Sequence, residues 1–200
     1  MNKRQALLMA FILALGTVLV SCAGMMTKPT EANFKAPEVV LDSVQLSYYE
    51  GFWYYGGKTK TAMGKAPKGG GSSPITLAFV FEITNPNPYP ISLDSSSFFL
   101  FFEDYELRVV NDSNAMWIPA GKTNSKVLHV TLTPFSTYVK FLLASKQIAM
   151  ERGDKPWDKI TKWWTELPEM SFPIDLKEGN FTFSAEGGAV KVIPIAIRYP

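Results

Sequence analysis

Residues 75–90, ITLAFVFEITNPNPYP, decide the fold of this chain. Their first ten positions alternate, with Leu77, Phe79, Phe81 and Ile83 on one side, as in a strand that buries one face. Each proline that follows removes a backbone N–H and pushes the preceding residue out of the helical region, so strand pairing ends there. Asparagine side chains can bond nearby backbone N–H groups in place of the lost pairing. We therefore predict a buried strand that ends in a rigid corner, built by Asn85, Pro86, Asn87 and Pro88.

Strand-like runs surround this stretch on both sides. Residues 39–48 alternate with a slip near Asp42-Ser43, and further strands are predicted at 97–102, 105–110, 127–132, 170–176, 181–185 and 190–199. Turns are expected at 118–121, 178–180 and 187–188, where Pro, Gly and Asn gather. Seven or eight strands with turns about every ten residues predict a mainly β chain, an antiparallel immunoglobulin- or fibronectin-III-like β-sandwich.

A short helical insertion is predicted over residues 134–167, where the hydrophobic period changes. The first helix begins near Pro134 and ends at Gly153, with an apolar stripe of Phe135, Tyr138, Val139, Leu142 and Leu143. The second spans 156–167, with a stripe of Trp157, Ile160, Trp163, Trp164 and Leu167. Packing against the sheet is the simpler role of this second stripe. Its alternative is a docking helix in which Trp163 and Trp164 contact a membrane surface or a partner, beside Lys155, Lys159 and Lys162.

The N-terminus predicts export from the cytoplasm. Lys3 and Arg4 precede an uncharged apolar run over residues 6–20, which is too short for a membrane span and typical of a secretory signal. The run closes in Leu19-Val20-Ser21-Cys22, which resembles the bacterial lipobox. Residues 1–21 are therefore interpreted as a lipoprotein signal peptide; the alternative is a plain signal peptide whose cysteine is incidental.

Cys22 is the predicted lipidation site, where a diacylglycerol and a further fatty acid such as palmitate would be attached. More than one acyl chain makes membrane anchoring stable. Residues 22–36 then form a lipidated flexible tether, and residues 37–200 form one sandwich domain. Because Ala23 rather than Asp follows Cys22, the chain resembles lipoproteins sorted to the outer membrane, with the domain facing the periplasm.

The composition excludes several classes of function. Without residues 1–21, the totals of 20 basic and 18 acidic side chains lose Lys3 and Arg4, which leaves 18 of each. A neutral domain is not drawn to nucleic acid or to anionic lipid by its charge alone. Once Cys22 is lipidated, no thiol remains for a disulfide, a metal site or a nucleophile.

Catalytic groups are sparse as well. His129 is the single histidine and is expected on the polar face of a strand, so neither a zinc site nor a Ser-His-acid triad is expected. The acids Glu103, Asp104 and Glu106 are interpreted as a solvated hairpin edge. No phosphate-binding glycine loop is present, because Gly69-Gly70-Gly71 lacks the Gly-Lys-Ser/Thr ending. We expect no enzyme activity, no cofactor and no metal.

A second possible contact surface lies between the first two strands. The aromatic run contains Phe52, Trp53, Tyr54 and Tyr55, and a Gly- and Lys-rich stretch over 56–73 follows it as a long loop. These aromatic side chains either fold back over the sandwich edge or form a patch for a partner or a lipid interface.

The corner and its flanks resemble a known family, the late embryogenesis abundant type 2 family with its WHy (water stress and hypersensitive response) domain. The hallmark is a hydrophobic strand that runs into Asn-Pro-Asn, here residues 76–92. The likeness extends to residues 37–44, 93–107, 118–123 and 128–132. The resemblance implies a sandwich fold, a link to desiccation and cold stress, and no cofactor or catalytic residue. The loop at 56–73 and the helical insertion depart from the simple family pattern.

Two hypotheses follow from these patterns. The first is a non-catalytic envelope lipoprotein that protects membrane or client surfaces under water stress, in a desiccation response. The second is an accessory binding subunit of a periplasmic or outer-membrane assembly, docked through the aromatic run or the tryptophan helix.

Overall fold

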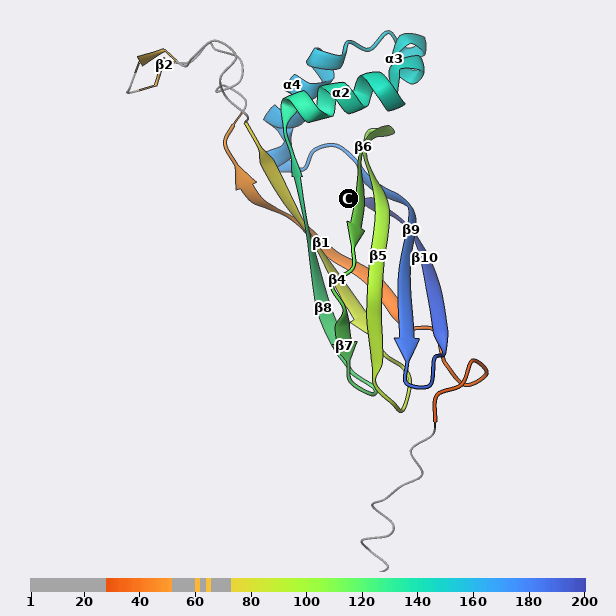
Figure 1. Cartoon of the computed structure of the whole chain (residues 1–200). Coiled ribbons are helices and arrows are strands. Elements are labelled where there is room, and N and C mark those ends of the chain that lie inside the picture. The colour runs from red at the N-terminus through yellow and green to blue at the C-terminus, as the bar shows by residue number, and fades with distance from the viewer. Residues whose placement is uncertain (1–27, 52–59, 62–63, 66–72) are drawn as a thin grey trace, which may run out of the picture.

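The computed structural model describes residues 28–51, 60–61, 64–65 and 73–200, and this part of the chain is mainly β (Figure 1). Its strands are β1 Glu38–Tyr49, β2 Lys60–Thr61, β3 Gly64–Lys65, β4 Ile75–Thr84, β5 Ile91–Phe102, β6 Tyr105–Asp112, β7 Met116–Ile118, β8 Thr123–Leu132, β9 Ile174–Ala185 and β10 Val190–Tyr199. Its helices are α2 Pro134–Ala144, α3 Lys146–Arg152 and α4 Pro156–Glu166, followed by the 3₁₀ turn η2 Leu167–Glu169.

Two antiparallel sheets pack against each other in a sandwich-like arrangement. One has the strand order β1-β4-β8; the other has the order β10-β9-β5-β6, with β7 also paired to β5. The aromatic rings of β4 join the sheets: Phe79 lies 5.5 Å from Phe98 of β5, and Phe81 lies 5.0 Å from Phe181 of β9, between ring centroids. The predicted mainly β, two-sheet architecture is confirmed.

Strand β4 is the central strand of its sheet and behaves as its alternation predicts. Its inward residues are fully buried: Ile75, Leu77, Phe79, Phe81 and Ile83. The slip predicted in the first strand is also confirmed, because the pairing of β1 with β4 shifts register between Leu41 and Ser43. Such a shift is a β-bulge, which lets a strand keep one face buried across an irregular sequence.

Two of the predicted turns are wrong in detail. Residues 178–180 do not reverse the chain, since β9 continues through them, with Glu178 at φ 50°. The register of β10 shifts nearby, between Ile195 and Ile197. The positive φ of Glu178 therefore belongs to a β-bulge between β9 and β10 and not to a turn. The turn predicted at 118–121 closes one residue later, with the N–H of Lys122 donating to the carbonyl of Pro119.

The helical insertion covers one end of the sandwich, opposite the end where the N-terminal segment arrives (Figure 1). Helix α2 begins with a capping box formed by Thr133 and Ser136, with Pro134 in the first turn. The first predicted helix is in fact two, because α2 ends at Ala144 and α3 begins at Lys146. Gly153, at φ 70°, ends α3 as predicted.

The apolar stripes of the two predicted helices differ in burial. In α4, Ile160, Trp163 and Trp164 are fully buried, so packing is confirmed and the surface contact assigned to the two tryptophans is wrong. In α2, the apolar stripe is largely exposed: Phe135 by 63%, Val139 by 38%, Leu142 by 38% and Leu143 by 80%. Helix α2 instead buries the face of Phe141, whose ring stacks on Tyr105 of β6 at 4.6 Å.

Candidate functional site

The Asn-Pro-Asn corner is built around two buried amide side chains. Asn85 directs its Nδ2 at the carbonyls of Tyr89, Ile118 and Pro119, at 2.9, 3.2 and 3.1 Å. Its Oδ1 accepts the backbone N–H of Asn87 at 2.9 Å. The side chain of Asn85 therefore replaces the strand pairing that the prolines remove and ties the corner to the turn before β8. The rigid corner predicted from the sequence has this physical basis.

The second asparagine fixes a distant part of the chain. Asn87 accepts the N–H of Lys35 at its Oδ1, at 2.8 Å, and donates from Nδ2 to the carbonyl of Lys35, at 2.9 Å. These two hydrogen bonds give the backbone of Lys35 the donor and the acceptor that a neighbouring strand would otherwise supply. The sequence does not reveal it, because the two residues are 52 positions apart.

Neighbouring contacts complete the junction between the N-terminal segment and the sandwich. Phe34 is buried and lies edge-on to Tyr89, and the Tyr89 hydroxyl donates to Oδ1 of Asn33 at 2.9 Å. Lys191 of β10 donates to the carbonyl of Phe34 at 2.5 Å. Among the described residues, a cavity of 460 Å³ lies beside this junction, between Tyr89 and the turn at Glu186-Gly187. We call the contacts of Asn33, Phe34, Lys35, Asn87 and Tyr89 the tether junction.

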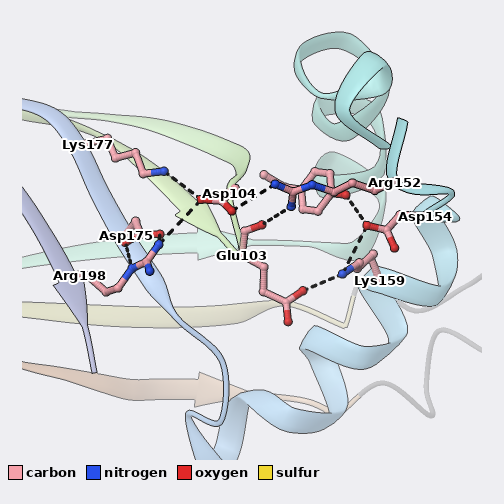
Figure 2. Close-up of polar contacts among 9 residues, drawn as sticks. Glu103, Asp104, Arg152, Asp154, Lys159, Asp175, Lys177 and Arg198 are labelled. Atoms are coloured by element: carbon pink, nitrogen blue, oxygen red, sulfur yellow. Dashed lines mark hydrogen bonds and ion pairs between the residues drawn. The ribbon is translucent and has the colours of Figure 1, made fainter. Parts of the chain in front are cut away.

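A second polar feature lies at the opposite end, where the β5–β6 hairpin meets the helices (Figure 2). Glu103 and Asp104 form the hairpin turn, both at positive φ, 46° and 74°. Glu103 accepts from Lys159 at 2.9 Å, from Lys162, and from the indole Nε1 of Trp163 at 3.2 Å. The acids predicted as a solvated edge are therefore paired, because three side chains of α4 close over Glu103.

Asp104 extends this cluster to the other strands (Figure 2). It pairs with Lys177 of β9 at 3.2 Å and with Arg152 of α3 at 3.4 Å. Arg198 of β10 approaches it at 3.8 Å and also holds Asp175 through two bonds of 2.7 and 3.0 Å. We call these residues the ion-pair cluster: Glu103, Asp104, Arg152, Asp154, Lys159, Lys162, Asp175, Lys177 and Arg198. Glu106, the third predicted edge acid, pairs with Lys140 of α2 at 2.5 Å.

The cluster shifts the pKa values of its members. Burial raises the pKa of Glu103, but the hydrogen bonds from Lys162 and Lys159 outweigh it, and the pKa is lowered. The hydrogen bond from Lys177 lowers the pKa of Asp104 against its partial burial. Burial and the hydrogen bond to Asp154 raise the pKa of the Tyr105 phenol to about 12.

The ion-pair cluster has a structural role, because it links separate elements of the fold. Its carboxylates already accept bonds from lysine and arginine side chains, and it joins the hairpin to α3, α4, β9 and β10. Among the described residues, no group of three His, Cys, Asp or Glu side chains is placed to hold a metal ion. His129 lies exposed on β8, opposite Ala78 of β4, on the polar face where the alternation puts it.

The structure describes only two of the remaining predicted site residues, Trp163 and Trp164. Cys22, Phe52, Trp53, Tyr54 and Tyr55 lie outside the described residues. Trp163 and Trp164 are buried in the helical cap, where the Trp164 indole donates to the carbonyl of Ser73 at 2.7 Å. In the described part of the chain, none of the helices has the length and apolar character needed to cross a membrane.

Comparisons with known proteins give distant likenesses only. No protein-family model and no curated protein matches this chain. Among solved structures, a protein from Archaeoglobus fulgidus is similar at 9% identity and a TM-score of 0.40, over 80% of this chain and 96% of that one. The structural genomics target SoR45 is similar at 9% and 0.44, over 82% and 85%. A candidate late embryogenesis abundant protein is similar at 12% and 0.32, over 100% and 91%.

These low identities and TM-scores assign neither family nor function. The fold and the site themselves define the class: a mainly β, two-sheet protein whose N-terminal segment is held at one end and whose helices close the other.

Proposed function

We propose that this protein is a non-catalytic lipoprotein of the bacterial cell envelope, held by lipid on Cys22 in the outer membrane and facing the periplasm. Its domain is an immunoglobulin-like sandwich of the late embryogenesis abundant type 2 kind, and its role is to protect membrane or client surfaces when water is lost. No cofactor, metal or nucleic acid takes part.

The tether junction is the observation that carries this proposal. A protein anchored at its N-terminus transmits every displacement of its domain through the segment that joins the two. Asn87 holds both backbone groups of Lys35, and Phe34 is buried beside Tyr89, so this segment is fastened where it enters the sandwich. The arrangement suits an anchored domain better than one whose N-terminus hangs free.

The protective role rests on the family resemblance and on the state of the charges. The Asn-Pro-Asn corner is the hallmark of that family. In this protein its two asparagines are bonded to each other, and Asn87 also closes the tether junction. The acids of the ion-pair cluster are matched by lysine and arginine. A domain whose charges are already paired loses little when surrounding water is withdrawn, and it can be held at high local density on a membrane.

Two experiments test the proposal separately. Lipidation is tested by labelling cells with radioactive palmitate: the wild-type chain should carry the label, and the Cys22→Ala chain should not. Label on both chains, or on neither, contradicts the anchor.

Protection is tested with the lipidated protein in vesicles that enclose a labile enzyme, taken through drying or freeze–thaw. Vesicles that carry an unrelated lipidated β-sandwich of equal mass are the control. We expect more residual activity and less leakage than in the control. Equal loss in both contradicts the stress role, and a stoichiometric crosslinked partner in intact cells would then identify an accessory subunit of an envelope assembly.

A further inference from the structure

Helix α2 presents an apolar face to solvent at the closed end of the sandwich. Phe135, Val139, Leu142 and Leu143 follow the spacing of one helix face. All four are exposed, and Met150 of α3, exposed by 71%, lies beyond the end of α2. We call these five residues the α2 face. Contiguous apolar surface of this kind marks an interaction site in a soluble domain.

The fold does not need this face. Helix α2 packs through its opposite side, where Phe141 stacks on Tyr105 at 4.6 Å and lies 6.2 Å from Trp163, between ring centroids. Tyr138 is likewise occupied, because it stacks on Trp157 of α4 at 4.6 Å. Helix α2 therefore buries one apolar side and directs a second apolar side outward, where it is exposed among the residues that the structure describes.

The chemistry of the α2 face favours lipid over protein. Protein contact sites concentrate their binding energy in Trp, Tyr and Arg, whereas the α2 face consists of Phe, Val, Leu and Met. Residues 134–151 contain Lys140, Lys146 and one acid, Glu151, which lies around the same surface hollow as Leu142, Leu143 and Met150. Lys140 is paired with Glu106, while Lys146 is exposed and has no ion-pair partner within the described ranges. An apolar helix face with charged side chains at its border, here the exposed Lys146 and Glu151, is the pattern of a helix that lies in the headgroup region of a bilayer.

We propose that the α2 face inserts into the interface of the lipid bilayer that holds the chain, as a second contact with that membrane. This inference rests on the proposed anchor at Cys22. Once the chain is anchored, the second contact is intramolecular, so even a weak apolar face is occupied for much of the time.

The lengths of the chain segments allow both contacts at once. Residues 30–34 form a turn, in which the N–H groups of Asn33 and Phe34 donate to the carbonyl of Thr30, so the eight residue steps from Cys22 to Thr30 set the reach, about 27 Å when extended. The 12 residues of β5 span about 40 Å, so a domain that lies along the membrane brings both of its ends close to it, and the tether has to cover only the short distance to the junction. The domain can therefore lie along the membrane, with the tether junction at one end and the α2 face at the other.

The test places a dye on the face and asks whether lipid reaches it. The full chain carries Cys22→Ser, which prevents acylation, and an added N-terminal His tag holds it on vesicles that include a nickel-chelating lipid, so the result does not depend on lipidation. A single cysteine at Leu143→Cys carries an environment-sensitive dye, and Ser125→Cys, exposed on β8, is the matched position. Vesicles contain phosphatidylcholine alone or with phosphatidylglycerol, and a quencher on the acyl chains reports depth.

We expect the dye at 143 to shift to the blue and to be quenched on both kinds of vesicle, because the contact is apolar, whereas the dye at 125 does neither. Phe135→Asp with Val139→Asp should abolish the change, and Val127→Asp, an exposed strand position, should preserve it. A dye at 143 that stays in water on both vesicles overturns the proposal. A shift without lipid that grows with protein concentration also overturns it, because a second copy then covers the face.

Discussion

Asn87 holds Lys35 by both of its backbone groups, through bonds of 2.8 and 2.9 Å. The motif that ends strand β4 thus also fastens the segment that leads into the domain. The prolines end the pairing of β4, Asn85 bonds the backbone of the corner in its place, and Asn87 attaches the N-terminal segment to that corner.

Replacing Asn87 with alanine should release this segment. The N–H and carbonyl of Lys35 would lose their partners in a partly buried place, and we expect a loss of about 2–3 kcal/mol in the free energy of unfolding. Hydrogen exchange at Lys35 should accelerate, while exchange in β4 at Phe79 should follow global stability only. Asn111→Ala, at an exposed asparagine, is the control and should leave both unchanged. Unchanged exchange at Lys35 in Asn87→Ala would show that the junction does not hold the segment.

The ion-pair cluster should make stability depend on acidic pH. The pKa of Glu103 is lowered in the folded state, so its contribution is present above the unfolded pKa and is lost as the pH falls through the folded pKa. We expect Glu103→Gln to cost about 1–2 kcal/mol at neutral pH and to flatten the fall of the urea midpoint below about pH 4. Glu38→Gln, at an exposed acid, should leave the profile as in the wild type. Parallel profiles for wild type and Glu103→Gln would contradict this assignment.

Tyr105 should make stability depend on alkaline pH in the opposite direction. Its folded pKa is raised to about 12 from 10.0, so its contribution is present below the unfolded value and is lost as the pH rises through the folded value. Ultraviolet titration of the folded protein should show a late phenol step near that value. Tyr105→Phe should remove this step and cost about 1 kcal/mol, because the bond to Asp154 is lost. A late step that persists in the variant would assign it to another tyrosine.

Gly179 should not tolerate a side chain, although its position in β9 has no special turn role. A Cβ there would lie 2.3 Å from Cγ1 of Ile195 and 3.1 Å from Cβ of Phe98. We expect Gly179→Ala to destabilise the fold by about 1–3 kcal/mol through overpacking. Adding Ile195→Ala should then cost less than it costs alone, since it removes the clashing atoms. Strict additivity in chemical unfolding would disprove the clash.

Residue spacing alone was sufficient to predict the elements that have one clear hydrophobic face. The strand at Ile75–Thr84, the slip after Leu41 and the buried stripe of α4 follow from residue spacing, because each of these segments carries one main hydrophobic face. Glu178 was misread for the opposite reason. A positive φ serves a turn or a bulge equally well, and only pairing with β5 and β10 selects the bulge.

Helix α2 shows the same limit at the candidate surfaces. Its spacing offers an apolar stripe containing Leu143 and another face containing Phe141, and periodicity does not say which one the sheet takes. The ring of Tyr105 makes that choice by stacking on Phe141. In α4 the stripe that carries Trp163 and Trp164 is buried, so its docking alternative is wrong, whereas the apolar stripe of α2 is exposed.

The sequence by itself determined that the chain is mainly β, where its central strand stops, and that a helical insertion follows the strand ending at Leu132. Those features depend on backbone preferences and on periods of neighbouring residues. Only the tertiary structure decided that Asn87 clamps Lys35, that Glu103 is paired with Lys159, and which side of α2 faces water. These contacts join residues more than 30 positions apart, or rest on packing against another element, and local preference carries no information about such partners.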